Sequence, residues 1–208
     1  TLIAAKWVEA VSIVTLSERA DELREKGLST REICQELHLS RATVEWLLAK
    51  QASKPGERPP ADVKVGWRTI GVSGFRMRAV AEIMAAIILE EQEKHDFDVE
   101  VLAGVMANGV PLGTLISELL EVDFAMIRPS REDTSIDFAS NFAGLKDKAV
   151  VIIDDVVSSG ATSREVIEFV KQEGGEPVLV IVLINKRAEN DLDGVPLRAL
   201  VRARPVGT

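Results

Sequence analysis

The sequence predicts an α/β fold, with a mostly parallel sheet flanked by helices, preceded by a small all-α domain. Three observations carry this prediction. The runs Val150–Ile153 and Val178–Ile184 are apolar without alternation, which is typical of parallel strands that helices cover on both faces. Segments with helical spacing separate such runs in the second part of the chain. The first part has helical spacing only, and a proline-rich stretch divides the two parts.

The composition is that of a folded protein in a reducing compartment. The chain has 208 residues, of which 46% are hydrophobic, and its single cysteine, Cys34, cannot form an internal disulfide. Lys6 and Glu9 interrupt the apolar run at the N-terminus well short of the roughly 20 residues that a membrane span requires. We therefore expect a cytoplasmic protein with no membrane partner. The net charge of −8 argues against non-specific coating of nucleic acid.

We place the domain boundary between residues 58 and 59. The stretch 51–62 contains three prolines and a glycine and has no hydrophobic periodicity, as expected of a linker. Residues 1–58 then form a helical domain with its linker, and residues 59–208 form the sheet domain.

Local signals in the first domain predict two short helices after an initial one. Gly27 ends the initial helix, Ser29 or Thr30 can cap the next, and Glu32 is placed for a capping box. The following turn has His38 where glycine is common, so this residue must be left-handed or the turn must differ in geometry.

Ser40 caps the last of these helices, which begins at Arg41, and the pattern is that of a helix-turn-helix. The second helix of such a motif enters a major groove with its first residues. The candidate DNA-binding residues are the outward-facing Arg41, Ala42 and Glu45, and the phosphate contacts Thr30, Arg31, Ser40 and Thr43. The alternative is a packing or dimerisation module, which the near balance of charges between residues 17 and 50 favours.

The second domain alternates helices and strands. In order, the pattern predicts a helix over 75–93, a strand within 98–105, a helix after Pro111, strands at 124–128 and 148–154, a helix at 163–172 and a strand at 177–184.

A pair of acids follows the apolar run of the strand at 148–154 and comes directly before a small, hydroxyl-rich turn. Asp154 and Asp155 are expected at the carboxyl end of the strand, where open α/β sheets bind ligands. The turn, which consists of Ser158, Ser159, Gly160, Ala161 and Thr162, offers backbone N–H groups and a helix N-terminus to a phosphate. Neighbouring carboxylates can bind the two hydroxyls of a ribose, so the pairing indicates a sugar phosphate. Simple helix capping, a metal site of receiver type and a degenerate dinucleotide fold are the alternatives.

The stretch VVIIDDVVSSGAT resembles the signature of the type I phosphoribosyltransferases, which bind 5-phosphoribosyl-1-pyrophosphate (PRPP). The resemblance implies that Asp154 and Asp155 hold the ribose hydroxyls, and that 158–162 holds the 5-phosphate. LAGVMANGVPLG resembles the pyrophosphate loop of that family, with the backbone amides of Met106, Ala107, Asn108 and Gly109 facing the pyrophosphate and Gly109 allowing close approach. Any Mg²⁺ is expected to arrive with PRPP, since no direct protein ligand for a metal is evident.

The segment FAMIRPSREDTSIDFASNFAGL is most similar to the mobile catalytic loop of orotate phosphoribosyltransferases. Arg128 matches the expected arginine, but Pro129 stands where that family carries lysine, and Arg131 is the only other basic residue of the loop. Cationic groups stabilise the charge that builds on departing pyrophosphate. The site is therefore better equipped to bind PRPP than to transfer from it. Lys186 and Arg187, after the last apolar strand, face either the ligand or solvent.

A helix-turn-helix before such a domain is similar to the archaeal phosphoribosyltransferase-like transcriptional regulators, which VGWRTIGVSGFRMRAVAEIMA also resembles. The resemblance implies a dimeric regulator that binds a palindromic operator and senses PRPP or a related nucleotide. The alternative is an active phosphoribosyltransferase acting on a purine or pyrimidine base. A third hypothesis is a relic of the fold that only forms oligomers.

Overall fold

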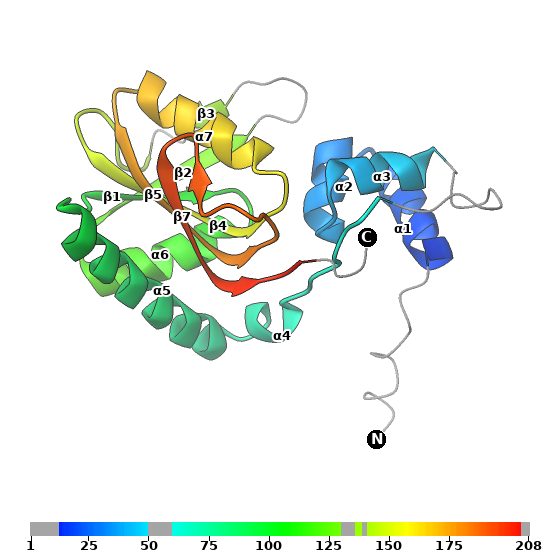
Figure 1. The fold of residues 1–208 in the computed structure, drawn as a ribbon, viewed down its shortest axis with the longest axis horizontal. Helices are drawn as coiled ribbons and strands as arrows, with labels where there is room; N and C mark the ends of the chain where they lie inside the picture. The colour runs from blue at the N-terminus through cyan, green and yellow to red at the C-terminus, as the bar shows by residue number, and fades with distance from the viewer. Residues whose placement is uncertain (1–12, 50–59, 130–135, 139–140, 205–208) are drawn as a thin grey trace. The chain divides into compact units, whose positions relative to one another are not determined.

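The computed structural model describes residues 13–49, 60–129, 136–138 and 141–204. The chain forms two compact units that meet in sequence between Lys64 and Val65 (Figure 1). The boundary predicted from the sequence, between residues 58 and 59, lies six residues before this one. Asp62 belongs to the first unit because its carboxylate accepts hydrogen bonds from Ser40 and Thr43 of that unit.

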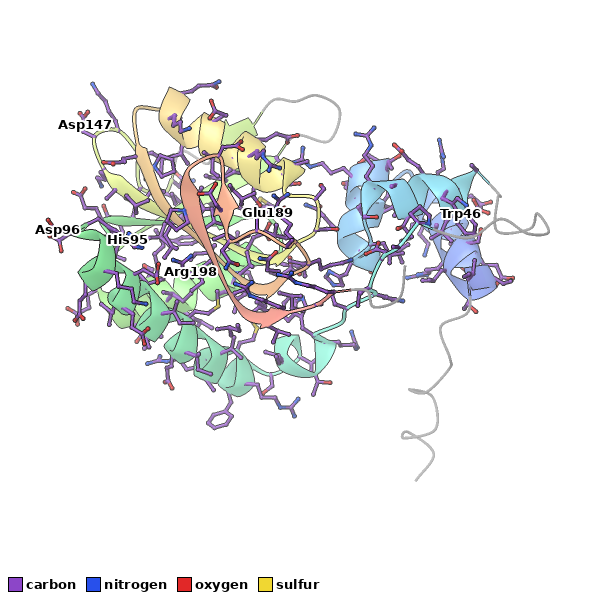
Figure 2. All side chains as sticks on the ribbon, viewed as in Figure 1. Trp46, His95, Asp96, Asp147, Glu189 and Arg198 are labelled. Atoms are coloured by element: carbon purple, nitrogen blue, oxygen red, sulfur yellow. The ribbon has the colours of Figure 1, made fainter. Side chains whose placement is uncertain are left out.

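The first unit, here called the head, is a bundle of three helices: α1 (Ile13–Glu25), α2 (Thr30–Leu37) and α3 (Arg41–Leu48). Ile33, Val44 and Leu47 are buried between them, and Trp46 packs partly buried against this core (Figure 2). Both hydrogen bonds of the predicted capping box form between Ser29 and Glu32.

The second unit, here called the sheet domain, begins with α4 (Arg68–Gly71) and the long helix α5 (Gly74–His95). The remaining elements are β1 (Val101–Val105), α6 (Gly109–Leu120), β2 (Asp123–Pro129), β3 (Ile136–Phe138), β4 (Ala149–Val157), α7 (Ala161–Gln172), β5 (Glu176–Asn185), β6 (Asp191–Leu192) and β7 (Val195–Arg202). The strand order is β3-β2-β1-β4-β5-β7-β6. The β1, β2, β4, β5 and β7 ladders are parallel, and β3 and β6 pair antiparallel at the two edges.

Helices cover both faces of the central strands (Figure 1). Helices α5 and α6 pack on one face, where Val151 and Ile153 of β4 are buried. Helix α7 packs on the other, where Val150 and Ile152 are buried. The predicted fold class is therefore confirmed, and the unbroken apolar runs are explained because successive side chains of one strand enter two different cores.

A buried carboxylate ties the end of α5 to the sheet. Glu91 is 2% exposed, and its Oε2 lies 2.6 Å from Nη2 of Arg198 on β7. Lys94 and His95 reach the same carboxylate from the helix at 3.1 and 3.4 Å. His95 and Arg198 are labelled in Figure 2. Burial raises the pKa of Glu91, but the hydrogen bonds and charges of Arg198 and Lys94 outweigh burial and hold this pKa below its ordinary value.

We expect Glu91→Gln to lower the free energy of unfolding at pH 7 by about 2 kcal/mol, because Arg198 loses the charge that it faces. A lowered pKa in the folded state stabilises above the unfolded pKa, and this contribution disappears as the pH falls through the folded value. Denaturant titrations should therefore show the difference shrinking below about pH 4.3. Glu168→Gln, which changes an exposed glutamate of α7, should stay within about 0.5 kcal/mol of the wild type at every pH.

Candidate functional site

The two candidate ligand loops meet where the direction of the chain through the sheet reverses. From β1 the chain passes through α6 to β2 on one side, and from β4 it passes through α7 to β5 on the other. Strands β1 and β4 pair from Val101↔Val150 to Gly104↔Ile153, so the loops that follow them start side by side. Open α/β sheets bind ligands in the crevice at such a switch point.

The acidic pair, predicted at the carboxyl end of a strand over 148–154, lies inside β4, which extends three residues further, to Val157. The strand continues to Val157 because β5 runs beside it, with Val157 paired to Asn185. The ladder with β1 stops at Ile153, so Asp154 and Asp155 stand on the part of β4 that β1 leaves uncovered. The pairing of β4 with β5 beyond Ile153 therefore fixes the backbone that carries both acids.

Asp155 is the buried member of the pair, with 6% of its surface exposed. Its Oδ2 accepts hydrogen bonds from Nε1 of Trp67 at 2.7 Å and from Nδ2 of Asn108 at 3.0 Å. Because Asn108 belongs to the predicted pyrophosphate loop, this carboxylate ties that loop to β4. Trp67 is a site residue that sequence reasoning missed, and its separation of 88 residues from Asp155 leaves no local signal that would have revealed it.

Asp154 is half-buried, and its Oδ1 accepts the backbone N–H of Asp155 at 2.8 Å. It is the less buried of the two acids. The pair therefore combines a buried carboxylate that contacts Trp67 and Asn108 with one that is only half-buried.

Met106, Ala107 and Asn108 form the turn from β1 into α6, and the Met106–Ala107 peptide bond is cis. Gly109 is the buried first residue of α6. A Cβ at this position would lie 2.1 Å from the carbonyl oxygen of Ile153. The close approach that Gly109 permits in the structure is thus to the backbone of β4, which seats the whole loop beside the acids.

Ser158, Ser159 and Gly160 form the turn from β4 into α7, and Ala161 and Thr162 open that helix. Gly160 has a left-handed backbone, with φ +81°. The exposed hydroxyl of Ser159 accepts the N–H of Ala161 at 3.3 Å. The predicted phosphate residues therefore surround the N-terminus of a helix, where backbone N–H groups and the helix dipole favour an anion.

Two arginines that the prediction did not assign hold this turn. Nη1 of Arg187 and Nη1 of Arg164 donate to the carbonyl oxygen of Ser159 at 2.6 and 3.2 Å. Buried Asn185 accepts the backbone N–H of Arg187 at 2.7 Å and fixes the bend that carries it. Within the described ranges, nothing accepts the buried Nε–H of Arg187. Each guanidinium group also pairs with a carboxylate, Arg164 with Asp193 and Arg187 with Glu189, both at 3.0 Å.

Arg128 lies on β2, beside the predicted pyrophosphate loop, with its Nε 3.4 Å from Sδ of Met106. Arg131 lies outside the described residues. The catalytic role assigned to these two arginines stays a prediction. In the part of the chain that the structure covers, no three His, Cys, Asp or Glu side chains gather as a metal site would require. No described helix is both long enough and apolar enough to cross a membrane.

The head presents the expected turn and second helix. His38 adopts a left-handed conformation, with φ 52°, and Ser40 caps α3. Arg41, Ala42 and Glu45 are exposed on α3, and Nε of Arg41 lies 2.7 Å from Oε1 of Glu45.

The structure places the predicted phosphate contacts of the head less favourably. Thr43 is buried and its hydroxyl donates to Oδ2 of Asp62 at 2.9 Å, so it holds the chain after α3 and does not face solvent. The backbone N–H of Ser40 donates to the same oxygen at 2.6 Å. Thr30 and Arg31 are partly buried at the start of α2. Cys34 packs partly buried on the head core, and burial raises the pKa of its thiol to about 11, which keeps it protonated at neutral pH.

The sequence matches the phosphoribosyl transferase domain family over residues 69–195. The fold is similar to that of adenine phosphoribosyltransferase from Thermoanaerobacter pseudethanolicus, with a TM-score of 0.56 and 17% identity over 71% of this chain and 92% of that one. The enzyme from Rhodothermus marinus gives a TM-score of 0.55 and 18% identity over 71% and 90% of the two chains. Fold and site thus define a protein with a type I phosphoribosyltransferase domain.

Two transcriptional regulators are more similar in sequence. The transcriptional regulator GfcR of Thermoplasma acidophilum is 47% identical over 196 residues, which cover 94% of this chain and 98% of the relative. GfcR of Picrophilus torridus is 44% identical over 191 residues, covering 92% and 97%. The chain belongs to the GfcR family of archaeal transcriptional regulators, as the resemblance predicted.

Proposed function

We propose that the protein is a DNA-binding transcriptional regulator, and that its sheet domain binds PRPP or a related phosphoribosyl nucleotide as the effector. The single observation that carries this proposal is the meeting of three groups at the switch point. They are the turn 106–109, the acids Asp154 and Asp155, and the arginine-backed turn 158–162. Each group suits one part of PRPP: the turn 106–109 suits the pyrophosphate, the two acids suit the ribose hydroxyls, and the turn 158–162 suits the 5-phosphate.

The hydrogen-bonding groups of this site favour binding. A 5-phosphate at the start of α7 meets backbone N–H groups and lies near Arg164 and Arg187, while the ribose hydroxyls donate to Asp154. Mg²⁺ belongs to this proposal only as a partner of pyrophosphate, since PRPP brings its own oxygen ligands.

For regulation, the effector must bind one arrangement of the dimer more tightly than another, since equal affinity for both shifts no equilibrium. A dimer also presents two copies of α3 to half-sites about 34 Å apart, so the operator should be palindromic. The protein then acts in the cytoplasm, on DNA.

The competing function is transfer of ribose 5-phosphate to a base. Arg128 beside Met106 is the observation that favours it, because a cation there can meet departing pyrophosphate. Incubation with PRPP, Mg²⁺ and each purine and pyrimidine base, followed by a pyrophosphate assay, decides the matter. Turnover would establish the enzyme, whereas calorimetric binding of PRPP without turnover supports the sensor.

We expect Asp154→Asn to weaken PRPP binding about tenfold or more, because a charge-assisted hydrogen bond to a ribose hydroxyl contributes about 1.5–3 kcal/mol. Isothermal titration calorimetry with PRPP and Mg²⁺ measures the change, and thermal unfolding should be nearly unaffected.

Asp147→Asn is the matched control, since Asp147 is an exposed aspartate that precedes β4, at the amino end of the strand and away from the site (Figure 2). Its left-handed backbone, with φ 58°, suits asparagine as well as aspartate. If Asp154→Asn binds PRPP as tightly as this control does, the acids do not hold ribose.

We expect Arg41→Ala to weaken operator binding by about 5- to 150-fold, which is the range for losing one base-reading arginine. The guanidinium must leave Glu45 to reach DNA, but an exposed pair of this kind costs less than about 1 kcal/mol to separate. Fluorescence anisotropy with a labelled genomic operator measures the affinity at fixed salt.

Arg19→Ala serves as the comparison because Arg19 is an exposed arginine of α1 that pairs with Glu22 in the same manner. It removes the same charge from the head without touching α3. If the two substitutions weaken operator binding equally, the effect of Arg41→Ala comes only from the loss of one positive charge. In that case α3 is not the helix that reads the DNA bases.

A further inference from the structure

Asp155 joins the candidate ligand site to the stretch of chain that enters the sheet domain. Its Oδ2 accepts the Nε1–H of Trp67 at 2.7 Å and an Nδ2–H of Asn108 at 3.0 Å. Asn108 belongs to the turn 106–109, whereas Trp67 is the third residue of the sheet domain, which begins at Val65. One carboxylate oxygen accepts about two hydrogen bonds, and these two donors supply that number. The positions of the turn and of the indole therefore depend on the same oxygen.

Trp67 also anchors the first helical turn of the sheet domain. Its carbonyl oxygen accepts the N–H of Ile70 at 2.8 Å and that of Gly71 at 3.1 Å, which closes α4 (Figure 1). Its ring lies against Gly71, where an added Cβ would be 2.7 Å from Cζ3 of the indole. No residue of α4 is itself buried, so the turn depends on its anchors. An indole that leaves Asp155 therefore loosens α4.

A second carboxylate fixes the same stretch of chain to helix α3 of the head. Asp62 stands five residues before Trp67 in the sequence. Its Oδ2 accepts the backbone N–H of Ser40 at 2.6 Å and the hydroxyl of Thr43 at 2.9 Å. Ser40 caps α3, so this contact lies at the N-terminus of that helix. The segment 62–67 thus has one end fixed to the start of α3 and the other end fixed to the acid pair.

From these two anchors we infer that the segment 62–67 is the path by which a ligand at the acid pair changes DNA binding by the head. Trp67 is the positioning residue at the ligand end of this path. A ligand on the turn 106–109 fixes Asn108, which holds Asp155 where it accepts the indole N–H. Departure of the indole would then leave a buried carboxylate without one of its donors, which is unfavourable. The inference deepens the proposed function and rests on it, since it takes the sheet domain as the sensor.

Hydrogen exchange measures the first step of this path. PRPP with Mg²⁺ should slow exchange of the Ile70 and Gly71 amides about fivefold or more in the wild type, because ligand and seated indole stabilise each other. Trp67→Phe removes the indole N–H and keeps an aromatic ring. Its α4 also keeps the hydrogen bond from Arg76 to the carbonyl oxygen of Thr69. In this variant, saturating PRPP should leave the exchange of the α4 amides within about twofold of the ligand-free rate.

Operator binding, followed by fluorescence anisotropy, measures the second step. Saturating PRPP should change the operator affinity of the wild type about fivefold or more. Two glycines inserted between Lys64 and Val65 leave both anchors in place but make the path longer and flexible, so the change should fall below about twofold. Trp67→Phe should lose the response in the same way. Trp46→Phe makes the same chemical change in the head core and is the matched control, which should keep the wild-type response (Figure 2).

A measurement without ligand separates the path from the identity of the effector. Asp155→Asn weakens the acceptor of the indole N–H, because an amide oxygen carries no charge. It should shift operator affinity about threefold or more in the wild-type chain, and not in the chain with two added glycines. A double-mutant cycle over these four proteins gives the coupling directly.

The outcomes distinguish the path from the proposed function. If PRPP does not bind the wild type, the proposed effector is wrong, and the Asp155→Asn cycle still decides whether the path exists. If PRPP changes operator affinity equally with and without the two glycines, sensing stands and the path is overturned. Faster exchange of the α4 amides on PRPP binding would also overturn it, because the ligand would then release the indole. A wild type that binds PRPP with no change in operator affinity would overturn both proposals.

Discussion

Gly109→Ala is expected to lower the free energy of unfolding by about 3–5 kcal/mol, the largest loss of stability from any single methyl group added at the candidate site. The new Cβ would stand 2.1 Å from the carbonyl oxygen of Ile153 and 3.1 Å from Cα of Asp154. Both atoms belong to the backbone of a central strand, so neither can move aside without shifting β4. Helix α6 must instead move away from the sheet.

Chemical denaturation measures this loss, and Gly74→Ala is the matched control. Gly74 is the first residue of α5, as Gly109 is of α6, but a Cβ there meets nothing within 4 Å. The control should keep its stability within about 1 kcal/mol or gain slightly, because alanine favours helix. If Gly109→Ala unfolds at the same denaturant concentration as the control, α6 does not seat against β4 as described.

Gly160→Ala is expected to weaken PRPP binding by about tenfold or more while the fold is kept. The position has φ +81°, which costs an L-residue about 1–2 kcal/mol, and its Cβ would lie 2.8 Å from Leu192, 3.1 Å from Arg164 and 3.3 Å from Arg187. These two guanidinium groups would have to shift from the Ser159 carbonyl, so the turn that they hold would be displaced.

Gly194→Ala separates the two causes of this effect. Gly194 has φ +89°, but a Cβ there meets nothing within 4 Å. It should therefore lose about 1–2 kcal/mol of stability and bind PRPP normally by calorimetry. Normal binding by Gly160→Ala as well would show that the turn 158–162 does not hold the phosphate.

The elements of the head were predictable because their signals are local. Ser29, Glu32 and Ser40 act within one turn of their own helices, and the sequence places them correctly. The left-handed conformation that the sequence allows for His38 is also found. What the sequence missed in the head is Asp62, whose carboxylate buries the hydroxyl of Thr43. That contact spans 19 residues, so no helical or turn spacing marks it.

The sheet was predicted in its centre and missed at its edges. Apolar runs marked β4 and β5, whose side chains enter both cores. Strand β7 was missed because its sequence VPLRALVR mixes proline and arginine with apolar residues, and its pairing with β5 is a tertiary contact. Strand β4 proved longer than predicted for the same reason, since Val156 and Val157 continue a ladder that only β5 provides.

The sequence by itself determined the α/β class, the head and the motif of two acids followed by a small hydroxyl-rich turn. Each of these is written in neighbouring residues, through caps, periodicity and the chemistry of single side chains. Only the tertiary structure decided that Asp155 binds Trp67 and Asn108, and that Arg164 and Arg187 hold the Ser159 carbonyl. These contacts join residues far apart in the chain, and their partners are fixed by which strands pair and which helix faces the core. No local pattern encodes that choice.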